Sequence, residues 1–124
     1  MVQRVNYKYL PEAIGPYAHA TKYNGTLFIS GLTAYGTDVQ AKTLKEQSSE
    51  ILSQIGHILQ QERCSKYSLV KMSIFVKDVG EIENLRGQLF DFYEGALPAS
   101  SLVEVSNLFH PDLKVEIEAI VALE

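Results

Sequence analysis

Two runs near the end of the chain decide the fold: Leu97–Val105 (LPASSLVEV) and Lys114–Ala122 (KVEIEAIVA). In both runs apolar and polar residues alternate, which is the period-two pattern of a β-strand with one buried face. The segment between them contains His110-Pro111-Asp112, a composition that is typical of a loop. The two runs therefore predict consecutive strands, and their polar side chains are the first candidates for a functional site.

A β-hairpin is predicted near the start of the chain, where Tyr17–Tyr23 and Thr26–Leu32 flank the dipeptide Asn24-Gly25. This dipeptide tolerates the positive φ angles that a type I′ turn requires. Apolar side chains point to both sides of the second strand, so we expect both faces of the sheet to be buried there.

A long helix is predicted after a polar loop at residues 35–42. Thr43 and Glu46 have the spacing of a capping box, in which both side chains bind backbone amides at the start of a helix. Apolar residues then recur at helical spacing to about Glu62. The predicted buried stripe consists of Leu44, Ile51, Leu52, Ile55, Ile58 and Leu59. The residues predicted to lie outside the stripe are Lys45, Gln54 and Gln61.

A strand and a second helix are predicted in the next part of the chain. Leu69–Val76 alternates in the pattern of a strand. The side chains expected on its buried face are Val70, Met72, Ile74 and Val76. Residues 78–81 can cap a second helix, which ends before Gly95 and Pro98. The apolar side chains of this helix are Ile82, Leu85, Leu89, Phe92 and Tyr93.

The predicted order of elements is strand, strand, helix, strand, helix, strand, strand within a single domain of residues 1–124. This order indicates the α+β class, with a mixed sheet and two helices on one of its faces. The opposite face carries apolar residues but has no helix to cover it. We therefore expect another copy of the chain to cover that face in a homo-oligomer.

Composition places the chain among soluble proteins of one domain. Hydrophobic residues make up 46% and charged residues 21% of the chain, and no apolar run approaches the ~20 residues of a membrane helix. The single cysteine, Cys64, and the lack of an apolar leader predict a reducing cytoplasm. A net charge of −4 without clustered lysine or arginine argues against nucleic acid as a partner.

Glu116 and Glu118 are the strongest candidates for chemistry. They lie two residues apart on one predicted strand and so share a face, where a pair of carboxylates can accept and donate protons. The same spacing is also typical of a solvated strand face without a catalytic role. The residues alone leave both interpretations open.

Other residue types that carry chemistry form no recognisable motif. The three histidines have no metal-ligand spacing, and the sequence has no glycine-rich phosphate loop and no dinucleotide fingerprint. Ser100 and Ser101 lack the Gly-x-Ser-x-Gly turn that exposes a nucleophilic serine. The sequence therefore predicts neither a metal site nor a cofactor.

Five short segments occur in an order that is typical of one protein family. They are Ala13–Tyr17, Ile29–Gly31, Phe75–Asp78, Pro98–Ala99 with Val103–Val105, and Val115–Ala119. Through them the chain resembles the RidA family of reactive imine and enamine deaminases, also called the YjgF or L-PSP endoribonuclease family. The resemblance implies a chorismate-mutase-like subunit in a homotrimer, with clefts between neighbouring subunits that hydrolyse 2-imino acids to 2-keto acids and ammonia without a cofactor.

The resemblance also assigns roles to residues of this chain. Glu116 falls at the position of the family's water-positioning carboxylate, and Tyr17 falls at the tyrosine that closes the cleft. Ser30 and Gly31 fall on the segment that lines the cleft. The implied ligand is a small molecule.

Ser100 is the main departure from the family pattern. The carboxylate-binding arginine of the deaminases belongs immediately after Pro-Ala, and a hydrogen bond from a neutral serine is about half as strong as one from a charged group. Leu102 stands where many members have cysteine, and Arg86 stands where many have asparagine. Arg86 either replaces the lost charge in the cleft or is a surface residue of its helix; alternatively, the site takes a ligand without a carboxylate.

Two functions are consistent with these observations. The first is a deaminase that hydrolyses a small reactive imine or enamine, of the 2-iminobutanoate/2-iminopropanoate type or an altered substrate, with Glu116 directing water. The second is a non-catalytic trimer that binds a small metabolite or regulates a partner through the same cleft. RNA cleavage, which one family name implies, fits poorly with the acidic net charge.

Overall fold

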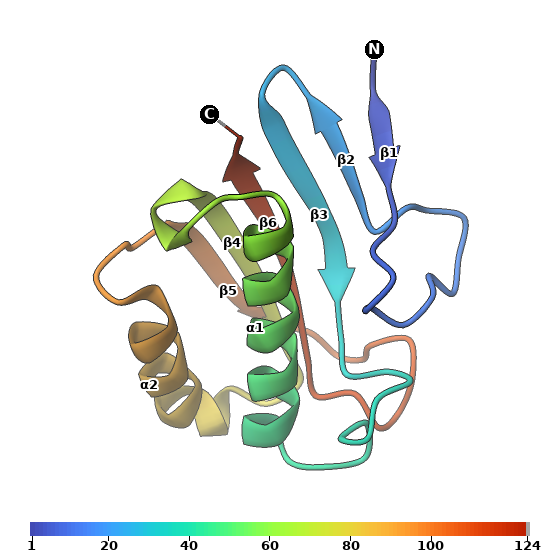
Figure 1. The fold of residues 1–124 in the computed structure, drawn as a ribbon. Helices are drawn as coiled ribbons and strands as arrows, with labels where there is room; N and C mark the ends of the chain where they lie inside the picture. The colour runs from blue at the N-terminus through green and yellow to red at the C-terminus, as the bar shows by residue number, and fades with distance from the viewer. Residues whose placement is uncertain (124) are drawn as a thin grey trace.

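A computed structural model describes residues 1–123 as one six-stranded sheet with both α-helices on the same face (Figure 1). The strands are β1 (Gln3–Val5), β2 (Ala20–Tyr23), β3 (Thr26–Leu32), β4 (Leu69–Val76), β5 (Ala99–Glu104) and β6 (Val115–Ala122). The helices are α1 (Leu44–Gln61) and α2 (Ile82–Tyr93), with short 3-10 helices η1 (Lys66–Ser68) and η2 (Val79–Glu81). The predicted α+β class is therefore confirmed. Glu124, the last residue of the predicted domain, lies outside the described residues.

The sheet has the strand order β1-β2-β3-β6-β4-β5. Strand β5 runs parallel to β4, because α2 carries the chain back across the sheet between them. The other neighbouring strands are antiparallel. β5 and β6, which are consecutive in the sequence, are thus separated by β4, and β6 lies inside the sheet between β3 and β4.

The turn and the start of α1 follow the local sequence. Asn24 and Gly25 have φ angles of 51° and 69°, as a type I′ turn requires. Thr43 and Glu46 form the predicted capping box, in which each side chain accepts a backbone N–H from the other residue. α2 ends before Gly95, whose φ of 90° is readily adopted only by glycine.

Within residues 1–123 neither α-helix is long and apolar enough to cross a membrane.

The core lies between the sheet and the two helices. The whole predicted stripe of α1 is buried, and α2 contributes three further buried side chains. The buried side chains of α2 are Leu85, Leu89 and Tyr93.

Three details of the sequence prediction are wrong. The pairing of β4 with β6 shifts register between Leu69 and Lys71, so Val70 is 48% exposed instead of sharing the buried face with Met72. Gln54, predicted outside the stripe of α1, is only 5% exposed. The edge strand β1 was not expected, because three residues are too few to establish an alternating pattern.

Gln47 of α1 is fully buried and connects α1 to two loops. Its Nε2 donates to the carbonyl oxygens of Gln40 at 2.9 Å, Lys42 at 3.1 Å and Asp112 at 2.8 Å. Its Oε1 accepts the backbone N–H of Lys114 at 2.9 Å. One side chain therefore satisfies backbone groups of the loop before α1 and of the loop before β6.

Candidate functional site

A β-bulge in β3 shapes the floor of the main cavity. Ile29 pairs with Ala119 of β6 and Leu32 pairs with Ile117, so β3 has one more residue than β6 over this stretch. Leu27 and Ile29 are buried before the bulge, and Leu32 and Ala34 are buried after it. The buried positions thus change from odd to even residue numbers at the bulge. The extra residue bends the strand and redirects the side chains of residues 30–31.

Gly31 brings its backbone directly against the side chain of Glu116. A Cβ atom at Gly31 would lie 2.8 Å from the carboxyl carbon of Glu116 and would overlap its Oε2. A residue without a Cβ is therefore required for the strand to approach the carboxylate this closely. The bulge and the glycine together place the Glu116 carboxylate beside the backbone of β3.

Glu116 lines a cavity of about 700 Å³. Three other residues predicted to belong to the site, Tyr17, Ser30 and Gly31, line the same cavity. This volume falls in the range of small-molecule sites. Further lining residues include Glu12, His19, Tyr35, Gln54, Phe109 and Glu118. The structure thus brings four of the seven predicted residues together.

His19 holds the cavity wall that is formed by residues 10–19. Its side chain is buried, and its Nδ1 accepts the backbone N–H of Tyr7 at 2.8 Å. Because Nδ1 is an acceptor, the ring proton lies on Nε2, which donates to the carbonyl oxygen of Pro11 at 2.8 Å. His19 is therefore a structural residue of the cavity. Its partners are distant in the sequence, and no local pattern could have identified this role.

Tyr17 and Ser30 offer polar groups to a ligand in different ways. Tyr17 lines the cavity and is 47% exposed, so part of its side chain is accessible to a ligand. The Ser30 hydroxyl donates to the carbonyl oxygen of Ala18 at 2.7 Å, which leaves its oxygen as an acceptor.

Negative charge is concentrated in the cavity. Glu12, Glu116 and Glu118 line it, and no lysine or arginine of the described residues does. Burial and, to a smaller extent, the neighbouring Glu118 charge raise the pKa of Glu116 above its ordinary value. Glu116 therefore binds a proton more readily than a surface carboxylate, which suits a group that takes a proton from water.

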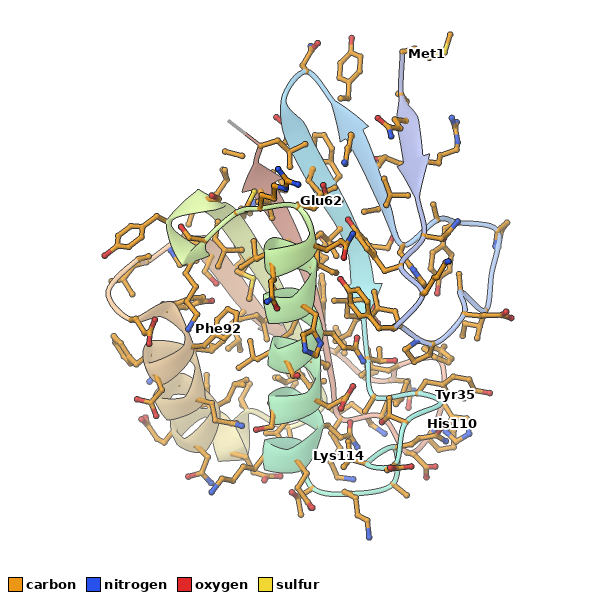
Figure 2. All side chains as sticks on the ribbon, in the orientation of Figure 1. Met1, Tyr35, Glu62, Phe92, His110 and Lys114 are labelled. Atoms are coloured by element: carbon orange, nitrogen blue, oxygen red, sulfur yellow. The ribbon has the colours of Figure 1, made fainter. Side chains whose placement is uncertain are left out.

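Aromatic rings border the cavity where two loops meet. The ring centroid of Tyr35 lies 5.1 Å from that of Phe109 and 5.4 Å from that of His110. Figure 2 shows Tyr35 and His110 side by side, beyond the end of β3 and before the start of β6. Tyr35 and Phe109 both line the cavity. These rings come from loops far apart in the chain, so no local sequence pattern predicts that they meet at the cavity.

Known proteins resemble the chain over nearly its whole length. The family described as Endoribonuclease L-PSP matches residues 8–123. A RutC family protein of Synechocystis is 34% identical, with 91% of this chain and 90% of the relative covered. The chain belongs to the RidA/YjgF/L-PSP family. The 2-iminobutanoate/2-iminopropanoate deaminase of the mouse is 30% identical to this RidA-family chain, with 89% of the chain and 83% of the relative covered.

Solved structures of other proteins share the fold of this RidA-family chain. A protein of the conserved Rid family from Yersinia pestis has a TM-score of 0.87 and 31% identity, and the similarity covers 98% of this chain and 99% of that one. Yeast Mmf1 has a TM-score of 0.88 at 24% identity, with 98% of each chain covered. The family and the fold that the sequence predicted are therefore confirmed.

Three predicted site residues of this RidA-family chain lie outside the lining of the cavity. Ser100 and Leu102 belong to β5, which is separated from β6 by β4, and Leu102 packs against the core. Arg86 is exposed on α2, and its Nη1 lies 3.1 Å from a carboxylate oxygen of Glu83. A role for these three residues at the ligand site requires a neighbouring subunit and stays a prediction.

Proposed function

We propose that this RidA-family chain hydrolyses the C=N bond of a small imine, or of the imine tautomer of a small enamine, to give a carbonyl product and ammonia. The observation that carries the proposal is the approach of the Glu116 carboxylate to the Gly31 backbone within a cavity of small-molecule size. Relatives from mouse, mite and cattle are named 2-iminobutanoate/2-iminopropanoate deaminase, which supports the reaction class.

Glu116 has the central role in the proposed reaction. Its carboxylate positions a water molecule and takes a proton as the water oxygen attacks the imine carbon. The imine nitrogen takes up that proton, which gives a neutral carbinolamine. The hydroxyl proton of the carbinolamine then passes through Glu116 to the nitrogen, and ammonia departs as the carbonyl forms. A carboxyl with a raised pKa can both accept and return the proton.

We also propose that the chain acts as a homotrimer in which a neighbouring subunit completes the cleft. Phe28 and Val103 lie on the sheet face without helices and are 43% and 44% exposed, so a second copy has apolar surface to bury there. Light scattering is expected to give three times the chain mass of 13.9 kDa. A mass near that of one chain would contradict a cleft between subunits.

Hydrolysis of 2-iminobutanoate tests the proposed function. The imine is generated in place by a threonine dehydratase, and its hydrolysis competes with trapping by semicarbazide. Wild type and Ser100→Arg are compared, since the arginine restores the family's partner for the substrate carboxylate. Acceleration by either protein supports imine hydrolysis. If neither accelerates this imine or a carboxylate-free imine, the alternative of a non-catalytic binding protein is favoured.

The Gly31→Ala variant is expected to lose activity while it keeps its stability. The new Cβ displaces the Glu116 carboxylate, and misplacing a catalytic group by about 1 Å can reduce the rate by about 100-fold. The carboxylate is the free end of a flexible side chain, so the fold accommodates the change. Gly56→Ala is the control, because a Cβ there meets no atom within 4 Å. Equal activities of the two variants would contradict the prediction.

Activity is expected to fall on the acid side at a higher pH than for an ordinary glutamate. Glu116 acts as a carboxylate, so protonation removes its function, and burial together with Glu118 raises its pKa. Glu118→Gln removes the like charge, lowers the pKa of Glu116 and moves the acid limb of kcat/KM to lower pH. The measurement is the pH profile of both proteins; coincident acid limbs would show that Glu118 does not act on Glu116.

A further inference from the structure

The charge of the cavity disfavours a ligand with a carboxylate. Glu12, Glu116 and Glu118 line it, and the described residues place no lysine or arginine among them. The carboxylate of an imino acid would lose hydration there without gaining a charged partner from the same subunit. The family pattern has an arginine at position 100 of β5, but this chain has a serine there, so that charged partner for a carboxylate is missing.

The aromatic residues of the cavity add a feature that suits an organic cation. Tyr17, Tyr35 and Phe109 line the same space as the three glutamates. Tyr17 and Phe109 are 47% and 53% exposed, so their rings are accessible. The face of an aromatic ring attracts ammonium-like groups, and it also provides apolar surface for an alkyl chain.

Neither Arg4 nor Arg86 of the same subunit lines this cavity. Arg4 borders a smaller hollow of about 310 Å³ that shares Tyr17 and Ser30 with the main cavity. Its guanidinium donates to the backbone carbonyl oxygen two residues earlier, at 3.4 Å. Arg86 forms an exposed ion pair with Glu83 on α2. Each has a contact of its own outside the main cavity.

We propose that the cavity takes a small organic cation without a carboxylate, and that the substrate reacts as an iminium ion. This inference rests on the proposed imine hydrolysis and specifies its substrate class. The glutamates supply the opposite charge, the rings supply apolar surface, and Ser100 reflects the loss of a carboxylate from the ligand. The preceding reaction must then convert a primary amine into its imine, as an amine oxidation does.

The reacting molecule carries a positive charge at every stage except the first carbinolamine. Water adds to the iminium carbon and gives a proton to Glu116, which forms a neutral carbinolamine. Its nitrogen takes the proton back, the C–N bond breaks with its electron pair on ammonia, and the protonated carbonyl gives its proton to ammonia. One iminium ion and one water thus give one carbonyl compound and one ammonium ion. The cavity carboxylates stabilise each cationic species on this path.

Two imines that differ only in a carboxylate provide the test. An amine oxidase acting on propylamine generates 1-propanimine, and a threonine dehydratase acting on threonine generates 2-iminobutanoate. Wild type is expected to show a kcat/KM for 1-propanimine at least about 10-fold higher than for 2-iminobutanoate. Glu118→Gln is expected to reduce that preference. Asp91→Asn, an equal charge change at an exposed site on α2, is expected to leave it unchanged.

Binding of stable probes separates this inference from the proposed function. Calorimetry is expected to show binding of propylammonium that weakens in Glu118→Gln, and weaker binding of butanoate to wild type. If propylammonium binds in this way but no imine is hydrolysed, imine hydrolysis is wrong and the ligand class stands. If 2-iminobutanoate and butanoate are preferred instead, the inference is overturned. Loss of that preference in Arg4→Gln or Arg86→Gln would then identify the arginine that binds the carboxylate.

Discussion

The Glu116→Gln variant is expected to lose imine hydrolysis by about 100-fold to 10,000-fold in kcat, the range found when a general base is removed. Glutamine has the shape of glutamate and can still hold a water molecule, but it cannot take a proton from it. The half-buried position of Glu116 makes its charge costly, so the neutral variant is expected to be at least as stable as wild type. The measurement is kcat on the better of the two imines, with a thermal melt beside it.

Glu118→Gln is the matched control for this prediction. Glu118 lies on the same face of β6 and lines the same cavity, but it is more exposed, and the atoms nearest to a Cβ at Gly31 belong to Glu116. Its substitution is expected to change substrate preference and pH dependence far more than kcat at neutral pH. Equal losses in the two variants would show that the cavity needs negative charge and that Glu116 has no special role.

The Gln47→Leu variant is expected to reduce the free energy of unfolding by about 2–5 kcal/mol, because it leaves several buried backbone groups without partners. Leucine fills a similar volume and favours the helix, so neither a cavity nor helix propensity accounts for the loss. Urea unfolding measures the effect as a lower midpoint with an unchanged slope.

Gln61→Leu provides the control on the same helix. Gln61 is exposed at the end of α1, and its substitution is expected to stay within about 0.5 kcal/mol of wild type. If Gln47→Leu unfolds at the same urea concentration as this control, the hydrogen bonds of Gln47 add no net stability. The two loops would then be held by packing alone.

The sequence predicts the elements of this fold whose causes are local. The backbone preferences of Asn24 and Gly25 determine the turn. The side chains of Thr43 and Glu46 determine where α1 starts. The position of Val70 could not be predicted, because the register shift depends on how β4 pairs with β6. Gln54 looked solvent-exposed by residue type, although α1 buries it beside the cavity.

The site was accessible from the sequence only in part. The family resemblance identified Tyr17, Ser30, Gly31 and Glu116, and the structure brings these four to one cavity. The position of the Tyr35 and Phe109 rings and the roles of His19 and Gln47 depend on contacts between distant segments, so no sequence motif contains them. The grouping of Glu12 with the glutamates of β6 could not be predicted either, because it requires the loop that contains Glu12 to fold beside β6.

The bulge in β3 also predicts how the chain tolerates insertions and deletions. Removing one residue at positions 30–31 would restore a regular pairing of β3 with β6 and would keep Leu32 and Ala34 on the core face, because Leu32 would then follow Ile29 by two positions. Such a deletion would remove the close approach of the strand to Glu116 without turning the core residues outward. Selection for a folded subunit therefore does not protect the geometry around Glu116 against this change in length, and only selection for the site itself can maintain it.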